Sequence, residues 1–246
     1  MTLHPGAAWG ALLALAGAAL ILLTRQGTPA GALAGLAVAL LAAAGFGAAA
    51  LLPLATFVLG AGLLTRAGRE RKERLSAAEA DRGRRGAPHV AAKLSLPALA
   101  GVLAFLRAAP EGSLALVYVA ALAGAFADTG ATEAGPLLRG RAFGLRSGRL
   151  TALPHGTPGG MSAGGFLAAA LAALAVAAGG WGARLLESVP AGWTAAGAGF
   201  LASVLESLIA GTTWGTRMGH FGRNVFLSIA SGVLALSARA LGWTGS

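Results

Sequence analysis

The hydrophobic positions of this chain fall in long runs that no charged residue interrupts. The longest uncharged runs cover residues 5–24, 26–65, 150–183 and 188–205. A helix that spans a bilayer needs about 20 apolar residues, and only helices and closed barrels satisfy their backbone hydrogen bonds in lipid. These runs are too long for barrel strands and do not alternate apolar with polar positions. The pattern therefore predicts an all-α, polytopic integral membrane bundle.

The breaks between the runs predict eight spans within one membrane domain, residues 1–246. The expected spans are 6–24, 29–45, 47–64, 94–109, 113–128, 161–180, 193–212 and 224–242. Several of them are shorter than a comfortable crossing, so a bundle of seven spans is an alternative. A further alternative is that 94–109 and 113–128 form a re-entrant hairpin instead of two full spans.

The composition agrees with a membrane protein. Hydrophobic residues make up 56% of the chain, charged residues make up 11%, and the mean hydropathy is +0.70, whereas ordinary soluble domains contain about 25% charged residues. The first apolar run lacks the basic start of a signal peptide, so we expect a membrane span there. Cysteine is absent, which excludes disulfides and a thiol nucleophile.

Basic residues cluster between particular spans. The net charge is +10, and segment 66–93 holds nine of the 19 Lys and Arg residues. With eight spans, 16 of the 19 lie on one side, which the positive-inside rule makes the cytoplasmic side. We therefore expect 66–93 to be a basic cytoplasmic loop in a bacterial plasma membrane, with both termini outside. Orientation explains the basicity without nucleic acid, for which no aromatic platform or helix-turn-helix pattern is present.

Three carboxylates stand apart from the acidic residues of the loops. Asp128 and Glu133 lie where the fifth span meets the cytoplasm, and Glu206 lies inside the seventh span. An intramembrane carboxylate is costly unless it is paired or faces water, so it indicates function. Asp128 and Glu206 each follow a stripe of Gly and Ala at helical spacing, which predicts that both face the bundle interior.

We predict a catalytic Mg²⁺ site at these three carboxylates, because Mg²⁺ is usually held by one or two carboxylates together with substrate phosphates. Glu133 is about 140° around an ideal helix from Asp128, so the two converge only if the helix breaks near them. The alternative is that the two interior carboxylates pair with arginines for packing, Asp128 with Arg139 or Arg141.

A Gly-rich segment, LPHGTPGGMSAGG (153–165), opens the sixth span. We expect it to close a cytoplasmic substrate loop, 129–160. A helix N-terminus attracts anions, and Gly156, Gly159 and Gly160 let the backbone approach a phosphate closely. Nearby basic side chains suit phosphate oxygens, namely Arg139, Arg141, Arg146 and Arg149. The alternatives are an ordinary Gly-Pro turn and arginines that only orient the protein.

Other polar positions accompany these segments. Asn224 begins a polar stripe on the last span with Ser228 and Ser231. This stripe either joins helices through hydrogen bonds or lines a headgroup pocket. His155 and His220 are candidate general bases, with solvated loop histidines as the simpler interpretation.

The same segments, in this order, resemble one family of integral membrane proteins. That family includes phytyl-phosphate kinase and is related to the CTP-dependent polyprenol kinases. Its pattern has an RR-x-x-QVLANGG segment, then ADTWASE-G, PPGTNGGVS, DSLLGA and an Asn-rich helix start. This chain reads GRRGAPHVAAKLS (83–95), ADTGATEAG (127–135), LPHGTPGGMS (153–162), ESLIAG (206–211) and GRNVFLS (222–228).

The resemblance implies phosphoryl transfer from CTP to an isoprenoid monophosphate, such as phytyl or geranylgeranyl phosphate, which gives the diphosphate. It implies that Asp128, Glu133 and Glu206 hold Mg²⁺ as catalytic residues, and that the prenyl chain lies between helices in the lipid. Together with the basic side chains noted above, the expected phosphate-binding set is Lys93, Thr129, Arg139, Arg141, His155, Gly156, Thr157, Gly159, Gly160, Ser207 and Asn224.

The chain departs from the family pattern at several positions. Lys93 stands where the pattern has Asn, and Leu94 and Ser95 replace its two glycines. Gly130 replaces Trp, and Glu206 replaces Asp. Glutamate keeps a metal ligand, but the loss of Asn-Gly-Gly marks a changed substrate or a lost activity.

Two other functions stay open. A transporter or flippase of a lipid phosphate also uses intramembrane polar groups, although the carboxylates lie toward one face and no repeated halves are visible. The other alternative is a non-catalytic member of the family, because of the altered segment 93–95.

Overall fold

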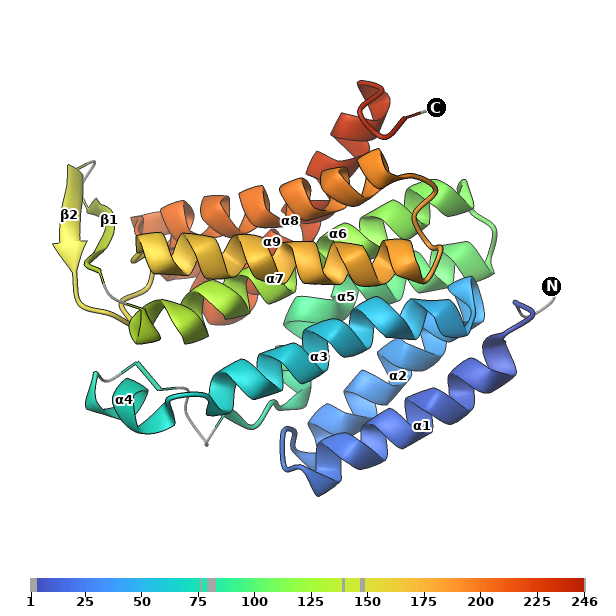
Figure 1. Cartoon of the computed structure of the whole chain (residues 1–246), viewed down its shortest axis with the longest axis horizontal. Coiled ribbons are helices and arrows are strands. Elements are labelled where there is room, and N and C mark those ends of the chain that lie inside the picture. Colours follow the sequence, from blue (N-terminus) through green and yellow to red (C-terminus); the bar gives the residue numbers. More distant parts are fainter. Residues whose placement is uncertain (1–3, 76, 79–82, 139, 147–148, 246) are drawn as a thin grey trace.

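The computed structural model describes residues 4–75, 77–78, 83–138, 140–146 and 149–245, and it confirms the all-α polytopic fold. Within the described residues, seven helices are long and apolar enough to cross a membrane. They are α2 (Pro29–Phe46), α3 (Leu51–Arg66), α5 (Ala87–Phe105), α6 (Glu111–Ala134), α7 (Ala163–Gly182), α8 (Val189–Ala210) and α9 (Thr213–Ala240). A shorter apolar helix, α1 (Ala7–Leu23), precedes them (Figure 1).

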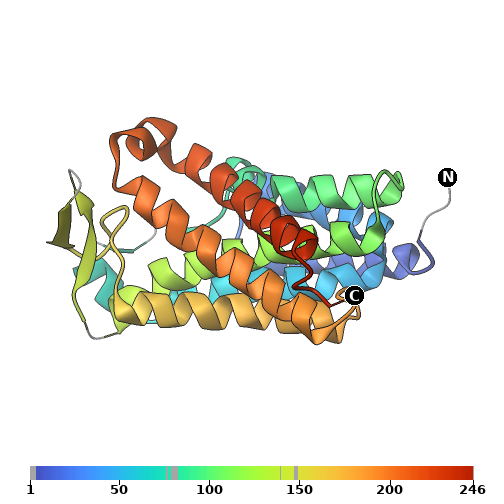
Figure 2. The ribbon, with the colours of Figure 1, turned by 90° about the horizontal axis from the view of Figure 1, so that it is seen from above.

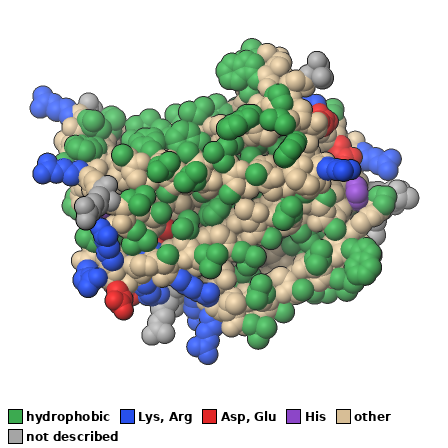
Figure 3. All heavy atoms as spheres, in the orientation of Figure 1, with side chains coloured by type: hydrophobic (Ala, Val, Ile, Leu, Met, Phe, Trp, Pro, Cys, Tyr) green, Lys and Arg blue, Asp and Glu red, His purple; other side chains and the backbone are tan. Residues whose placement is uncertain are grey.

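Shorter elements gather at one end of the bundle. The helix α4 (Arg69–Arg74) and the antiparallel hairpin of β1 (Ala142–Arg146) and β2 (Arg149–Leu153) lie there, and both chain termini lie toward the opposite end (Figures 1 and 2). We call the end with α4 and the hairpin the basic end. Figure 3 shows Lys and Arg side chains at the basic end and along the lower edge of the view, further charged side chains at the opposite end, and mostly uncharged surface between them, as expected for a bilayer-spanning bundle.

Helix α6 occupies the centre of this bundle. Every residue from Leu114 to Ala127 is buried, and α3, α5, α7, α8 and α9 all pack against it. Near its start, the Tyr118 hydroxyl donates a hydrogen bond of 2.9 Å to the carbonyl of Ala50. Ala50 ends the 3-10 turn η1 (Ala48–Ala50) that leads into α3, so this bond fixes the start of α3 against the central helix.

Small residues allow the close packing around α6, as the Gly and Ala stripes predict. A Cβ on Gly199 of α8 would lie 2.5 Å from the backbone nitrogen of Gly124 on α6. A Cβ on Gly101 of α5 would lie 2.7 Å from the carbonyl oxygen of Leu41 on α2. Lipid tails are as apolar as the helices, so van der Waals contact between closely approaching backbones drives helix association.

Two helices extend further toward the basic end than the sequence predicts. Helix α6 continues to Ala134 and α5 begins at Ala87, each about two turns beyond the predicted span. The expected loop 66–93 therefore contains α4 and the start of α5, and the expected loop 129–160 contains the end of α6 and the β hairpin. The polar residues near these helix ends do not terminate the helices, because side chains on neighbouring helices form hydrogen bonds and ion pairs with them.

The last helix also begins before its predicted start at 224. Helix α9 begins at Thr213, with a kink at Gly219, whose φ is 64°. The re-entrant alternative for the fourth and fifth spans is wrong, because α5 and α6 each have the length of a full span. With α1 included, the eight predicted spans all correspond to helices.

The contact between α6 and α8 can be tested with a matched pair of glycines. Gly199→Leu forces a side chain into the backbone of α6, and such overpacking costs about 1–3 kcal/mol or more. We expect a lower melting temperature and aggregation on extraction. Gly197 lies two residues earlier on the same helix, and a Cβ there would meet no atom within 4 Å, so Gly197→Leu should melt like the wild type. Equal melting of both variants would contradict this packing.

Candidate functional site

A polar pocket of about 230 Å³ lies at the basic end, between α5, α6, α8, α9 and the loop that leads into α7. It brings together most of the predicted site residues from separate segments of the chain. Those residues are Lys93, Asp128, Thr129, Glu133, His155, Gly156, Thr157, Gly159, Gly160, Glu206, Ser207 and Asn224. The fold therefore places the motifs of the sequence around one cavity.

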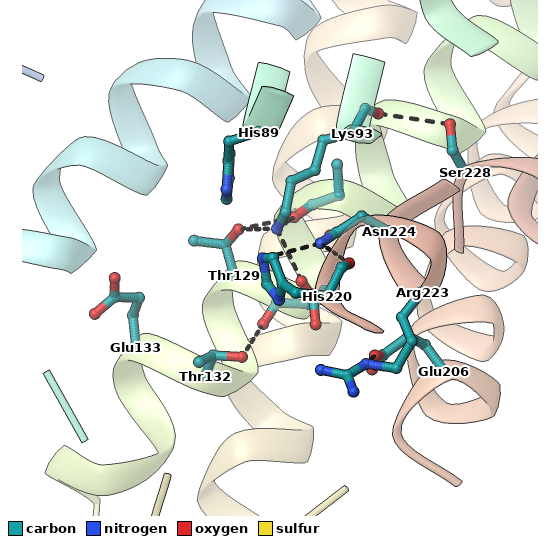
Figure 4. Close-up of polar contacts among 12 residues, drawn as sticks. His89, Lys93, Thr129, Thr132, Glu133, Glu206, His220, Arg223, Asn224 and Ser228 are labelled. Atoms are coloured by element: carbon teal, nitrogen blue, oxygen red, sulfur yellow. Dashed lines mark hydrogen bonds and ion pairs between the residues drawn. The ribbon is translucent and has the colours of Figure 1, made fainter. Parts of the chain in front are cut away.

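Lys93 of α5 is nearly buried, with 4% of its side chain exposed. Its ammonium donates hydrogen bonds to Asp128 Oδ2 (2.8 Å) and Thr129 Oγ1 (2.9 Å) on α6, and a longer one to the carbonyl of Ala125 (3.4 Å) (Figure 4). The cation thus holds α5 to α6 at the floor of the pocket. Asp128 keeps 19% of its side chain exposed, and this ion pair uses only one of its oxygens.

Glu206 of α8 forms a second ion pair beside the first. Its Oε1 accepts a hydrogen bond of 2.9 Å from Arg223 Nε on α9. On the same helix, Asn224 is buried, and its amide donates to the carbonyl of His220 (2.9 Å) and lies 3.1 Å from His220 Nε2. Helix α9 therefore contributes a cation, an imidazole and an amide to the wall of the pocket (Figure 4).

Glu133 differs from the other two carboxylates. Its Oε2 lies 2.7 Å from Lys72 Nζ, and its Oε1 accepts a hydrogen bond of 2.6 Å from Thr65 and lies 3.6 Å from Arg85. Figure 4 shows it apart from the residues around Lys93. Helix α6 does not break between Asp128 and Glu133, so the condition for their convergence is not met.

Lys72 makes the Glu133 contact part of a structural clamp. Both side chains are only 1% exposed, and the Lys72 ammonium also donates to the carbonyls of Leu64 (2.8 Å) and Thr65 (2.9 Å). These carbonyls belong to the last turn of α3, where no backbone partner is available within the helix. The clamp therefore joins α3, α4 and α6 at the basic end.

The Gly-rich loop forms one rim of the pocket. Gly156 and Gly159 have φ angles of 82° and 78°, a region that favours glycine. A Cβ on Gly159 would lie 2.7 Å from the nitrogen of Gly211 at the end of α8, so this glycine is also required for close packing. The N–H of Gly160 donates to the carbonyl of Thr157 (2.9 Å), so this amide closes a turn and is not directed at a ligand.

The predicted arginines have different surroundings. Arg139 lies outside the described residues. Arg141 is exposed and does not line the pocket, and the partner of Asp128 is Lys93 and not Arg141 as the packing alternative supposed. Arg146 binds the rim of the pocket, because its guanidinium donates to the carbonyls of Gly211 (2.9 Å) and Pro158 (3.0 Å). His155 lies 3.1 Å from the carbonyl of Gly140.

The sequence interpretation did not identify two contributors to the pocket, His89 and Arg223. His89 lies one turn before Lys93 on α5, and its ring stacks on His220 with a centroid distance of 5.8 Å. Arg223 was not among the predicted site residues, yet it pairs with Glu206. The spacing of His89 and Lys93, four residues apart, could have placed them on one helix face, but only if α5 had been predicted to start early enough.

The donor set of the pocket limits the metal prediction. Among the described residues, no three His, Asp or Glu side chains come together in an arrangement that could hold a metal ion. Three carboxylates line the pocket, but Glu133 is only 1% exposed and both of its oxygens have partners. That leaves Asp128 and Glu206, and two carboxylates fit the way Mg²⁺ is bound when phosphates complete its ligands. Glu133, with both oxygens engaged, does not fit that role.

Comparisons with known proteins agree with a membrane protein. Residues 12–224 match the family described as integral membrane protein DUF92. The chain is also 35% identical, over 176 residues, to an uncharacterized membrane protein of Synechocystis sp.. That alignment covers 68% of this chain and 66% of the relative, so the chain spans about two thirds of the relative's length. No solved structure matches.

The clamp and the pocket can be separated by mutation. Glu133→Gln leaves the buried Lys72 ammonium without its counter-ion, and breaking a buried pair costs about 3–5 kcal/mol. We expect earlier thermal unfolding in detergent and faster proteolysis between α3 and α5. Glu187→Gln, which removes an exposed ion pair with Arg239 at the other end, is the control. A Glu133→Gln protein with wild-type stability but altered ligand binding would place Glu133 in the site instead.

Proposed function

We propose that this chain, which belongs to the DUF92 family of integral membrane proteins, is a Mg²⁺-assisted kinase that converts an isoprenoid monophosphate to the diphosphate. The nucleoside triphosphate is CTP, and the lipid is of the phytyl or geranylgeranyl phosphate class. One observation carries the proposal. The segments that resemble prenyl-phosphate kinases line a single pocket at the basic end, where carboxylates and cations meet beside apolar helices.

The proposed reaction needs little from the protein beyond positioning and charge neutralisation. An ionised oxygen of the lipid phosphate attacks the γ-phosphorus of CTP and forms a new P–O bond. The bond from the γ-phosphorus to the β–γ bridging oxygen breaks, and CDP leaves with that electron pair. Because the attacking oxygen already carries negative charge, no strong general base is required, and neither His155 nor His220 needs that role.

The residues of the pocket suit these tasks. Lys93 and Arg223 carry the positive charge that phosphate oxygens require, and each already lies against a carboxylate on a neighbouring helix. Asp128 and Glu206 would hold Mg²⁺, which would neutralise negative charge on the nucleotide phosphates. The Gly-rich loop, held to α8 by Arg146, limits the size of the pocket. Glu133 has a positioning role, because it fixes the end of α6 from which Asp128 projects.

A non-catalytic member of the family is the second candidate. Both carboxylates of the pocket already have a cationic partner, Lys93 for Asp128 and Arg223 for Glu206. A pocket that is internally neutralised in this way can be purely structural. Lys93 supplies one of these cations at the position where the family pattern has Asn.

A transfer assay tests the kinase. Purified protein, Mg²⁺, γ-labelled CTP and geranylgeranyl phosphate should yield labelled diphosphate. Asp128→Asn keeps an oxygen acceptor for Lys93 but removes a negative charge, and we expect it to remain folded while turnover falls on the order of 100-fold or more. Glu187→Gln should match the wild type. No product with any nucleotide or prenyl length would favour the non-catalytic candidate.

The orientation of the pocket can be tested with introduced cysteines, because the chain has none of its own. Ala78→Cys lies between α4 and α5 at the basic end, and Ala109→Cys lies in the connection of α5 to α6 at the other end. The positive-inside rule predicts that a membrane-impermeant maleimide labels only Ala109→Cys in intact cells. The reverse labelling would place the pocket on the outer side of the membrane, where cytoplasmic nucleotide does not reach it.

A further inference from the structure

A second cavity, of about 470 Å³, separates two parts of the helix bundle. Helix α1 packs on α2, whereas α3 packs mainly on α6 and α7, and few residues of α3 touch α1 or α2. The cavity lies between them, and residues of α5 also line it. Its volume lies within the usual range of about 300–1,000 Å³ for small-molecule sites.

The walls of this cavity are apolar over most of its length. Along α3 its lining runs from Leu51 to Arg66, which corresponds to about 22 Å of helix, compared with a hydrocarbon core of about 30 Å. Ala, Gly, Leu and Val form most of that lining. Because the outer helices α1, α2 and α3 all face lipid, the cavity follows the direction and depth of a hydrocarbon chain in the bilayer.

One end of the cavity is strongly cationic. Arg25, Arg66, Arg85 and Lys93 line it, and no Asp or Glu is among the described residues that do so. Arg66 donates a hydrogen bond to the carbonyl of Thr24, which follows α1, and Arg85 donates to Thr65 Oγ1 (3.3 Å) at the end of α3. These contacts hold the guanidinium groups of Arg66 and Arg85 at the basic end, where positive charge attracts an anionic headgroup.

The cationic end also adjoins the polar pocket. His89, Lys93 and Thr129 line both cavities, and the Lys93 ammonium is anchored to Thr129 and Asp128 between them. A phosphate held at the cationic end would therefore lie next to the carboxylates of the polar pocket. A lipid in the apolar cavity would present its headgroup to that pocket without leaving the membrane.

We propose that the apolar cavity binds the hydrocarbon chain of an isoprenoid monophosphate, with the phosphate against Arg85 and Lys93, and that Gly17 and Gly35 set the chain length it accepts. This inference rests on the kinase function proposed above. Both glycines line the cavity, and a Cβ on either would meet no atom within 4 Å. They leave open the space that a larger side chain would fill.

The charge and shape of the cavity identify the occupant. Arg85 already lies 3.6 Å from Glu133, and Lys93 lies 2.8 Å from Asp128. Arg25 and Arg66 line the same end of the cavity, and a terminal phosphate monoester supplies two negative charges and several acceptor oxygens for such cations, whereas a neutral lipid supplies no charge. A cavity of about 470 Å³ suits a single hydrocarbon chain, whereas a phospholipid carries two. The isoprenoid monophosphate combines one chain with a terminal phosphate.

The first experiment locates the lipid independently of catalysis. The full-length protein in nanodiscs is irradiated with a geranylgeranyl monophosphate analogue that carries a diazirine on its chain, and adducts are mapped by mass spectrometry. We expect adducts on α1, α2 and α3, and competition by unlabelled geranylgeranyl phosphate. Equal competition by dioleoyl phosphatidate would overturn the single-chain assignment.

The second experiment tests the two glycines. Gly35→Phe and Gly17→Leu should lower kcat/KM for the C20 monophosphate about tenfold or more, in the range by which apolar pockets discriminate chain size, and should change that for the C10 monophosphate much less. Gly197→Leu, which also meets no atom within 4 Å but lines neither cavity, should behave as the wild type. Crosslinking of the C20 probe to α1–α3 should fall in parallel in the two cavity variants.

Together, the two experiments distinguish a failure of the proposed kinase function from a failure of the proposed lipid site. Adducts on α1–α3 that Gly35→Phe removes, without transfer from any nucleotide, would support the lipid site and contradict the kinase. Transfer by the wild type, with adducts elsewhere and unchanged chain-length preference in both variants, would support the kinase and contradict the lipid site.

Discussion

The burial of α6 by five neighbouring helices is the constraint on which the rest of the structure depends. A membrane helix normally turns one face to lipid, but the middle of α6 has no exposed residue. Such burial requires backbones to approach closely, and small residues such as Gly124 and Gly130 of α6 and Gly199 of α8 permit this approach. As a consequence, the polar residues near its end meet other helices and must find partners there.

Two lysines supply these partners with different results. Lys72 and Glu133 are both closed off, and Lys72 also satisfies the last carbonyls of α3, so this pair fixes the geometry of the basic end. A buried ion pair is weak evidence for added stability, although loss of one partner is costly. Lys93 and Asp128 form a similar pair that opens on a pocket. The same chemistry therefore serves as a clamp in one place and borders a cavity in the other.

The departure from the family pattern at Lys93 acquires a structural meaning. This lysine lies at the boundary of the polar pocket and the apolar cavity. In the proposed reaction a cation there would stand between a lipid phosphate and the nucleotide, where negative charge is greatest. In a non-catalytic protein the same cation would neutralise Asp128. The two functions differ in whether this ion pair opens to admit phosphate.

The sequence by itself determined the fold class, the positions of the helices, the inward direction of Asp128 and Glu206, and the set of segments that line the pocket. The first three follow from local properties, namely apolar length, helical spacing and residue size, whereas the set of segments follows from the resemblance to the prenyl-phosphate kinase family. Only the tertiary structure decided the partner of each charged side chain and the separation of Glu133 from Asp128. It also decided that the Gly160 amide donates to the carbonyl of Thr157 and not to a ligand. The positions of the helix ends at the basic end also depended on the tertiary structure. A polar residue there ends a helix only when no neighbouring helix supplies a hydrogen-bond or ion-pair partner for its side chain. Partners such as Lys93 and Asp128 lie 35 residues apart in the chain, and no local pattern specifies which of several nearby cations is packed against which carboxylate.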